Sequence, residues 1–106
     1  MIYVLDDMEV EPANVHAYLE AFETLCRPVA EENGQEFVGC LTTPRAIGEP
    51  VRVTSVYRVP DWSRWNEIRQ AVILDPRSAA WWEARQRLCV RGQRRFAEAT
   101  PSSPLL

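Results

Sequence analysis

The sequence predicts an α+β fold with the element order β-α-β-β-α-β, which is the ferredoxin-like arrangement. Residues 2–10 and 51–59 contain the β-branched and aromatic side chains that are typical of strands. Residues 13–33 instead place apolar side chains three and four positions apart, as an amphipathic helix does. We therefore expect a four-stranded antiparallel sheet with the helices on one face.

The first strand and the first helix are predicted over residues 2–10 and 13–33. Pro12 suits the start of a helix, where its missing N–H is not needed. Pro28 is expected to kink or tighten the end of this helix, and Gly34 to stop it. The apolar stripe of the helix consists of Val15, Leu19, Phe22, Cys26 and Val29, with Tyr18 and Leu25 on its flank.

A β-hairpin and a helix are predicted next. Residues 36–43 and 51–59 are two strands joined by a turn over 44–50, which contains Gly48 and has a proline at each end. Asp61 is a natural N-cap for the helix that follows.

The last third of the chain is predicted to contain a further helix and the fourth strand. Asp75-Pro76 breaks the preceding helix, and a new helical segment runs over residues 77–90. Gly92 is expected to end that segment, so that residues 93–100 form the strand and residues 101–106 a tail.

Composition limits the class of protein. A chain of 106 residues is one domain by size, with a formal charge of −3, and its 12 basic residues are all arginine. A mildly acidic chain with scattered arginines argues against nucleic-acid binding. We also expect neither a leader sequence nor a membrane span. The three cysteines are odd in number and far apart in the sequence, which indicates buried, reduced thiols in a cytoplasmic protein.

Several segments together resemble the NIPSNAP-like family of the dimeric α/β barrel superfamily. They are IYVLDDMEVEP, AYLEAF, ENGQEFVGCLTT, VTSVYRVPDWSRW, LDPRSAAWW and the ending PSSPL. The sequence departs from the family in the first strand. Val4 stands where the family commonly has an acidic residue, Asp6 where it has arginine, and Met8 where it has tyrosine. Tyr57 likewise stands where the family commonly has tryptophan.

The resemblance implies one dimeric α/β barrel domain over residues 1–106, in which two sheets pair through their helix-free faces. The need to cover a bare apolar sheet face favours the same homodimer. Proteins of this superfamily include cofactor-free monooxygenases of aromatic polyketides, lactone isomerases, polyketide cyclases, heme enzymes and proteins without known activity. Fold alone therefore does not decide the function.

The adjacent carboxylates of Asp6 and Asp7 are the unusual feature of the first strand. Because side chains alternate across a strand, the two point to opposite faces of the sheet. Asp6 is a candidate general acid or base in a cleft between the sheet and the helices. Two alternatives remain open: the strand frays after Leu5, or an aspartate makes a structural pair with Arg58 or Arg95.

Aromatic side chains indicate a pocket for a flat molecule. Four tryptophans lie in the second helical region, and Trp62, Trp65 and Trp82 are candidates to line such a pocket, closed by Tyr18 and Tyr57. Tyr57 is also a candidate hydrogen-bond donor to a substrate oxygen. The alternative is that these aromatic residues fill the core and a dimer interface.

Other reactive side chains carry weaker signals. His16 is on a polar helix face beside Glu20, so we expect it to be exposed and not catalytic. Cys40 lacks a histidine partner motif and is expected to be an inert, buried thiol. Arg95 is a candidate ligand for an anionic substrate group, or else a partner of a carboxylate.

These observations predict an enzyme that needs neither metal nor organic cofactor. It would act on a small aromatic or polyketide-like molecule in specialised metabolism, as a cyclase, isomerase or monooxygenase, with Asp6 and Tyr57 as catalytic residues. The alternatives are a non-catalytic protein that binds a hydrophobic ligand and a structural dimer. A heme enzyme is disfavoured because the single histidine is expected to be exposed.

Overall fold

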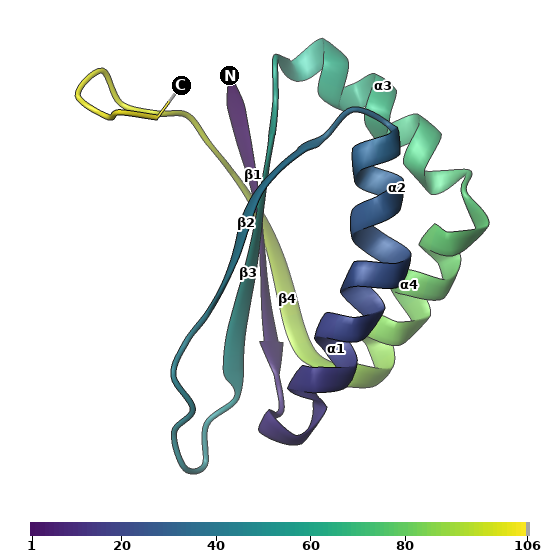
Figure 1. The fold of residues 1–106 in the computed structure, drawn as a ribbon, viewed down its shortest axis with the longest axis vertical. Helices are drawn as coiled ribbons and strands as arrows, with labels where there is room; N and C mark the ends of the chain where they lie inside the picture. The colour runs from purple at the N-terminus through teal and green to yellow at the C-terminus, as the bar shows by residue number, and fades with distance from the viewer. Residues whose placement is uncertain (106) are drawn as a thin grey trace.

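A computed structural model describes residues 1–105 and has the predicted ferredoxin-like architecture. One antiparallel sheet contains four strands in the order β2-β3-β1-β4. All the helices cover one face of this sheet, and both chain ends lie near the same end of it (Figure 1). The strands are β1 (Ile2–Val10), β2 (Glu36–Thr42), β3 (Val51–Val59) and β4 (Cys89–Ala97).

The first helical region is one continuous helix that changes its pitch in the middle. It consists of a 3-10 turn (Pro12–Asn14), α1 (Val15–Ala21), a π-helical turn (Phe22–Cys26) and α2 (Arg27–Glu32). Pro28 has no N–H to donate back along the helix, and the π-helical turn lies directly before it. The helix therefore changes type near Pro28, but the turn is wider than an α-helix and not tighter as predicted; such turns are often found at functional sites.

The end of α2 is fixed by a Schellman motif. Gly34 has a positive φ of 100°, and its N–H donates to the Glu31 carbonyl at 3.1 Å. The N–H of Gln35 donates to the Ala30 carbonyl at 3.0 Å. The helix stop predicted at Gly34 therefore holds, and it turns the chain directly into β2.

The second helical region consists of α3 (Trp62–Ile73) and α4 (Pro76–Leu88). The Asp61 side chain caps α3 by accepting a hydrogen bond from the Arg64 N–H at 2.7 Å, as its position predicts. Asp75 caps α4 by accepting from the Arg77 N–H at 2.9 Å. The Asp75-Pro76 pair thus ends one helix and starts the next.

The prediction for the fourth strand and for Gly92 was wrong by several residues. Helix α4 ends at Leu88, and β4 begins at Cys89, so Gly92 lies inside the strand opposite Met8. A Cβ at Gly92 would clash with Sδ of Met8, which shows that the glycine makes room for this side chain. Gly92 is therefore a residue of close approach within the sheet and not a helix stop.

The hydrophobic core lies between the sheet and the helices. Alternate residues of β1 and β3 point toward the helices, and they pack in two clusters. One cluster includes Val4, Tyr57, Phe22 and Ile68, and the other includes Met8 with residues of α1 and α4. The first cluster thus joins the π-helical turn, α2 and α3 to the sheet, and the second joins α1 and α4 to it, so both helical regions contribute to each cluster.

The helix-free face of the sheet is more polar than the sequence predicts. Asp7, Glu9 and Glu36 on this face form ion pairs with arginines of neighbouring strands. Leu5 and Val56 lie between these charges and are half-buried. This face therefore combines a small apolar centre with charged pairs.

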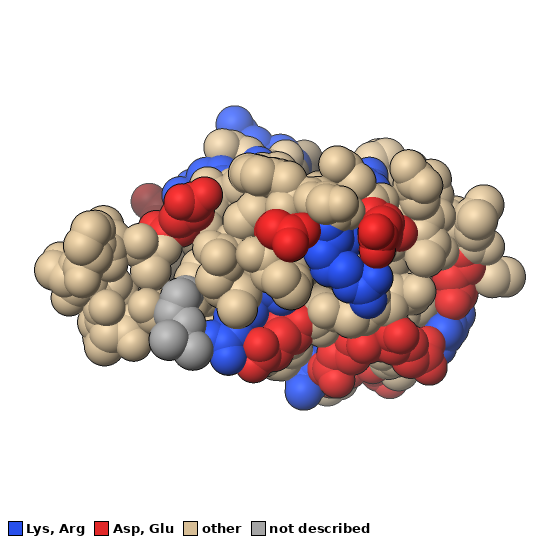
Figure 2. Space-filling model, turned by 90° about the horizontal axis from the view of Figure 1, so that it is seen from above, with Lys and Arg blue, Asp and Glu red and all other residues tan. Residues whose placement is uncertain are grey.

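The end of the molecule that lies at the top of Figure 1 carries both signs of charge. Red carboxylates stand on both sides of a blue arginine near the centre of this view (Figure 2).

Among residues 1–105, no helix is long and apolar enough to cross a membrane.

Candidate ligand-binding site

A cavity of about 460 Å³ lies between the sheet and the two helical regions. We call it the main cavity, and its volume falls in the range typical of small-molecule sites. The sheet contributes side chains from β1, β3 and β4, while the walls come from the π-helical turn, α2, α3 and α4. Its polar lining residues include Asp6, Tyr57, Arg69, Arg85 and Arg94, and its apolar ones include Cys26, Val29, Trp65, Val72, Trp81 and Trp82.

Asp6 lies at the sheet side of the main cavity and forms a bidentate ion pair with Arg94. Arg94 Nε donates to Oδ1 at 2.7 Å, and Nη2 donates to Oδ2 at 3.1 Å. The two residues are directly opposite each other in the β1–β4 register. Burial acts to lower the pKa of Arg94, but the Asp6 carboxylate outweighs it and raises that pKa above its ordinary value.

Asp7 and Arg95 form the corresponding pair on the other face of the sheet. Arg95 Nε donates to Oδ2 of Asp7 at 2.7 Å, and the Thr54 hydroxyl donates to Oδ1 at 2.6 Å. The structural Asp–Arg pair considered for Arg95 is therefore present, with Asp7 as its partner. Arg95 does not line the main cavity, and Arg94 occupies the place predicted for it. The alternative in which β1 frays after Leu5 is wrong, because the strand continues to Val10.

Three of the four tryptophans line the main cavity. Trp65 is buried, Trp81 is half-buried, and Trp82 is 57% exposed at the cavity's edge. Trp62 lies outside the cavity, where its ring packs 5.0 Å from that of Phe96. The structure thus places Trp65 and Trp82 as predicted, adds Trp81 and leaves out Trp62.

Tyr57 and Cys26 lie together in the cavity wall. The tyrosine hydroxyl and Sγ of the cysteine are 3.9 Å apart, within reach of a weak hydrogen bond to sulfur. Burial raises the pKa of Tyr57, so its hydroxyl stays neutral and able to donate. Burial also raises the pKa of Cys26 to about 12, so this thiol is not an activated nucleophile.

Three other candidate residues lie elsewhere. Tyr18 is buried in the core, with its ring 5.4 Å from that of Trp81, and is not part of the cavity wall. His16 is exposed and 3.9 Å from Glu20, as expected. Cys40 is exposed on β2, which corrects the expectation of a buried thiol.

Arg69 and Arg85 are cavity residues to which the sequence assigned no role. Arg69 follows Trp65 by four residues on α3, and Arg85 follows Trp81 by four residues on α4. Because residues four apart share a helix face, the cavity-facing tryptophans could have identified both arginines. The signal was present, but it depends on knowing which tryptophans face inward.

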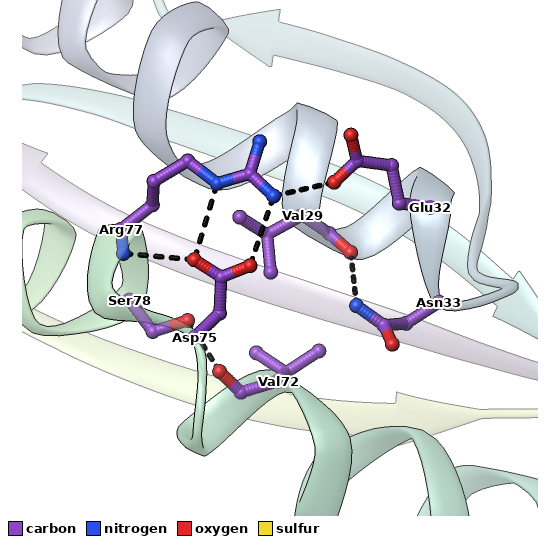
Figure 3. Close-up of polar contacts among 7 residues, drawn as sticks. All are labelled: Val29, Glu32, Asn33, Val72, Asp75, Arg77 and Ser78. Atoms are coloured by element: carbon purple, nitrogen blue, oxygen red, sulfur yellow. Dashed lines mark hydrogen bonds and ion pairs between the residues drawn. The ribbon is translucent and has the colours of Figure 1, made fainter.

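A polar network joins the rim of the main cavity across two helical regions. Figure 3 shows the Arg77 guanidinium between the carboxylates of Asp75 and Glu32. In the same region, the Ser78 hydroxyl donates to the Val72 carbonyl at 2.6 Å. These contacts connect the start of α4 to the end of α2. Val72 and Ser78 both line the cavity, so the network holds its rim in place.

Residues 1–105 contain no cluster of three or more histidine, cysteine, aspartate or glutamate side chains arranged to hold a metal ion. The main cavity itself contains one carboxylate and one thiol among its lining residues. Its donor set consists mainly of guanidinium groups, indoles and a phenol, which suit an organic molecule better than a cation.

Comparison with known families identifies the relatives of this chain. The NIPSNAP family model matches residues 3–104, which is nearly the whole length. The chain belongs to the NIPSNAP family. This membership confirms the resemblance seen in the sequence. No curated protein matches the chain.

Solved structures show the same fold in other NIPSNAP proteins. The chain is similar to a NIPSNAP family protein of unknown function from Agrobacterium tumefaciens, with 19% identity and a TM-score of 0.81, covering 100% of this chain and 94% of that one. It is also similar to an uncharacterized NIPSNAP domain protein from Burkholderia xenovorans, with 14% identity and a TM-score of 0.81, covering 98% and 99%.

The fold of this NIPSNAP chain is also similar, more distantly, to that of a different class of protein. A structure described as an antibiotic biosynthesis monooxygenase has 11% identity and a TM-score of 0.64, covering 95% of this chain and 100% of that one. At such low identity the likeness establishes a shared fold and nothing about activity.

Proposed function

We propose that this NIPSNAP protein is a cofactor-independent enzyme of specialised metabolism, acting in its main cavity on a small aromatic or polyketide-like molecule. The observation that carries the proposal is the Asp6–Arg94 pair on the floor of a cavity walled by Trp65, Trp81 and Trp82. Indole rings offer a flat ligand large apolar surfaces. The reaction class is proton transfer, as in cyclases, isomerases and substrate-assisted monooxygenases.

Asp6 and Tyr57 have complementary roles in this proposal. A substrate oxygen that displaces one Arg94 hydrogen bond would leave a carboxylate oxygen of Asp6 free to accept a proton. The neutral Tyr57 hydroxyl would donate a hydrogen bond to the oxyanion that develops. Arg94 would remain as the cation that balances the charge.

A non-catalytic ligand-binding protein is the second candidate, and one observation favours it. Both oxygens of Asp6 already accept a hydrogen bond from Arg94, so the carboxylate is held in a structural ion pair and not presented freely to a substrate. If this pair never opens, the cavity binds its ligand without chemistry.

Substitutions at matched positions distinguish these functions. Tryptophan fluorescence is titrated with a panel of aromatic acids, quinones and lactones, using Trp65→Phe and Trp81→Phe, with Trp62→Phe as the control outside the cavity. Product is then sought by mass spectrometry for each bound compound. We expect Asp6→Asn to abolish turnover and Asp7→Asn, on the opposite sheet face, to keep it. Turnover that survives Asp6→Asn contradicts the catalytic role, and binding without product supports the second candidate.

The proposal includes a homodimer formed through the helix-free sheet face, and a cytoplasmic location. Leu5 and Val56 form the apolar centre of that face, and charged pairs surround it, as in many protein interfaces. Three free cysteines agree with a reducing compartment. Analytical ultracentrifugation of the wild type and of Val56→Arg tests the interface. We expect a dimer for the first and a monomer for the second, whereas a monomeric wild type contradicts this part of the proposal.

A further inference from the structure

The main cavity carries more positive than negative charge. Arg69, Arg85 and Arg94 line it, and Asp6 is the one carboxylate among its lining residues. Asp6 is already engaged by Arg94 through two hydrogen bonds. Arg69, which is exposed, and Arg85, which is half-buried, therefore form no ion pair with a carboxylate of the cavity.

Arg85 is a half-buried cation whose guanidinium has weak partners only. Its Nε is buried and has no hydrogen-bond partner among residues 1–105. The polar contact that its guanidinium makes is from Nη2 to Sδ of Met8 at 3.5 Å, and a thioether is a weak acceptor. Its Cζ also lies 5.2 Å from the ring centre of Trp82. A buried donor on a charged group is costly when it is left unpaired, so a ligand acceptor that Nε meets after a small movement of the Arg85 side chain would remove this cost.

Arg69 lies within electrostatic range of Arg85 and Arg94. It has neither an ion pair nor a hydrogen bond with any other residue of the described chain. Burial, followed by the positive charge of Arg94, lowers the pKa of Arg69; the charge of Asp6 opposes this shift, and that of Arg85 adds to it. Like charges gathered in this way destabilise a protein unless a ligand neutralises them.

Much of the remaining wall of the cavity is apolar. Val29, Val72, Trp65 and Trp81 line it, and Ile73 and Trp82 are more than half exposed at its margin. The cavity thus offers apolar and aromatic surface together with unpaired cations, so a suitable ligand needs an apolar body and one negative group.

We propose that the ligand of the main cavity is an aromatic or alicyclic carboxylate whose anionic group binds between Arg85 and Arg69. This inference rests on the proposed function in that it takes the main cavity as the ligand site, and it adds the charge and the anchoring residues. Arg85 Nε supplies a donor that no protein group uses, and the planar guanidinium can bind both carboxylate oxygens.

A pair of probes that differ in charge tests the inference. Isothermal titration calorimetry compares 2-naphthoate with 2-naphthamide, which has the same flat body without the charge. We expect the acid to bind the wild type at least about tenfold more tightly than the amide, which corresponds to one charge-assisted hydrogen bond. Arg85→Met should reduce this preference to about twofold or less. Arg87→Met is the matched control, because Arg87 is exposed on the same helix and lies outside the cavity.

The thermal stability of the Arg85→Met variant without ligand provides an independent readout. Because Arg85 is an unpaired cation near two others, we expect Arg85→Met to raise Tm by about 4 °C. A lower Tm together with an unchanged preference for the acid assigns Arg85 a purely structural role and overturns the inference. Equal binding of acid and amide by the wild type also overturns it, while the cavity remains a ligand site. Failure of both probes to bind counts against the proposed function as well.

Discussion

Asp6 and Arg94 lie opposite each other on neighbouring antiparallel strands, and two hydrogen bonds of 2.7 and 3.1 Å join their charged groups. The Asp6 side chain is 20% exposed and that of Arg94 is 33% exposed, so the pair is largely shielded from water. Arg94 also lies over Trp65, with its Cζ 5.2 Å from the ring centre. This pair therefore belongs both to the sheet and to the cavity floor.

A double-mutant cycle should show strong coupling between these two residues. We expect Asp6→Ala and Arg94→Ala each to lower the free energy of unfolding, because each leaves the other charge without its partner. The double variant should be less destabilised than the sum of the two, with a coupling energy of about 1–2 kcal/mol. Urea denaturation at pH 7 measures all four proteins. Additive effects would show that the pair contributes no direct stabilisation.

Acid should destabilise the protein in part through Asp7. Burial acts to raise the pKa of Asp7, but hydrogen bonds from Thr54 and Arg95 outweigh it, and the pKa lies below its ordinary value of 3.8. A lowered pKa in the folded state means that the charged carboxylate stabilises the fold above pH 3.8. This contribution is lost as the pH falls through the lowered value.

The comparison of Asp7→Asn with the wild type isolates this effect. We expect the variant to be less stable at pH 7 and the difference to shrink steadily below about pH 4, where Asp7 of the unfolded wild-type chain binds a proton before Asp7 of the folded chain does. Urea denaturation over this pH range is the measurement. A difference that stays constant with pH would mean that the charge of Asp7 does not contribute. Asp61→Asn is a useful control, since it changes an exposed cap away from this face.

The cysteines should differ in their reactivity. With a pKa of about 12, roughly one Cys26 thiol in 10⁴ is ionised at about pH 8. Cys40 is exposed, although partial burial of its sulfur raises its pKa as well. We expect iodoacetamide at that pH to label Cys40 more than tenfold faster than Cys26, as followed by peptide mass spectrometry. Comparable labelling rates in the folded protein would show that Cys26 is accessible from the cavity.

The sequence predicted the bounds of a strand well where apolar side chains alternate along it. The ends of β1 and β3 agree with their predicted ranges, because each run is bounded by proline or turn residues. The ferredoxin-like order then followed from the spacing of the helices between them. Local pattern was sufficient here because every element carries its own periodicity.

The identity of the cavity arginine could not be derived in the same way. Arg94 and Arg95 are adjacent, and which one shares a sheet face with Asp6 depends on the β1–β4 register. That register shifts between Glu9 and Val10, and β4 begins earlier than Gly92 suggests. A one-residue shift moves every side chain to the other face, so the local sequence alone did not identify Arg94.

Burial of the aromatic residues also depended on packing between distant segments. Tyr18 was expected to close the pocket, but Trp81 lies against it and covers it from α4. The positions of these two residues are fixed by how α1 packs on α4, and no local pattern in either helix predicts that contact. Trp62 is similar, since its contact with Phe96 depends on the placement of β4.

The Arg77 network at the cavity rim should affect both stability and ligand binding. Arg77 donates hydrogen bonds to Asp75 within its own helix cap and to Glu32 at the end of α2. Arg77→Gln removes the connection between the two helical regions, so we expect a lower Tm and weaker binding of any cavity ligand. Arg87→Gln, which removes an exposed arginine of the same helix outside the main cavity, serves as the control. Equal effects of the two substitutions would mean that the network does not support the rim.

The turn after α2 provides a last test, because two of the four glycines of the chain have contrasting surroundings. Gly34 has a φ of 100°, and a Cβ there would lie 2.6 Å from Nη2 of Arg64. We expect Gly34→Ala to lower the free energy of unfolding by about 1–2 kcal/mol, because alanine pays a steric penalty at positive φ. Gly39 has a negative φ and open space around its Cα, so Gly39→Ala should be neutral or slightly stabilising.

Urea denaturation of both alanine variants measures this difference directly. Gln35 follows Gly34 and lines the main cavity, so strain at Gly34 should also disturb the cavity wall. We therefore expect Gly34→Ala, and not Gly39→Ala, to weaken the binding of 2-naphthoate. If the two variants were equally stable, the Schellman motif would not be what fixes the end of α2, and the position of Gln35 would have to depend on the β2–β3 pairing instead.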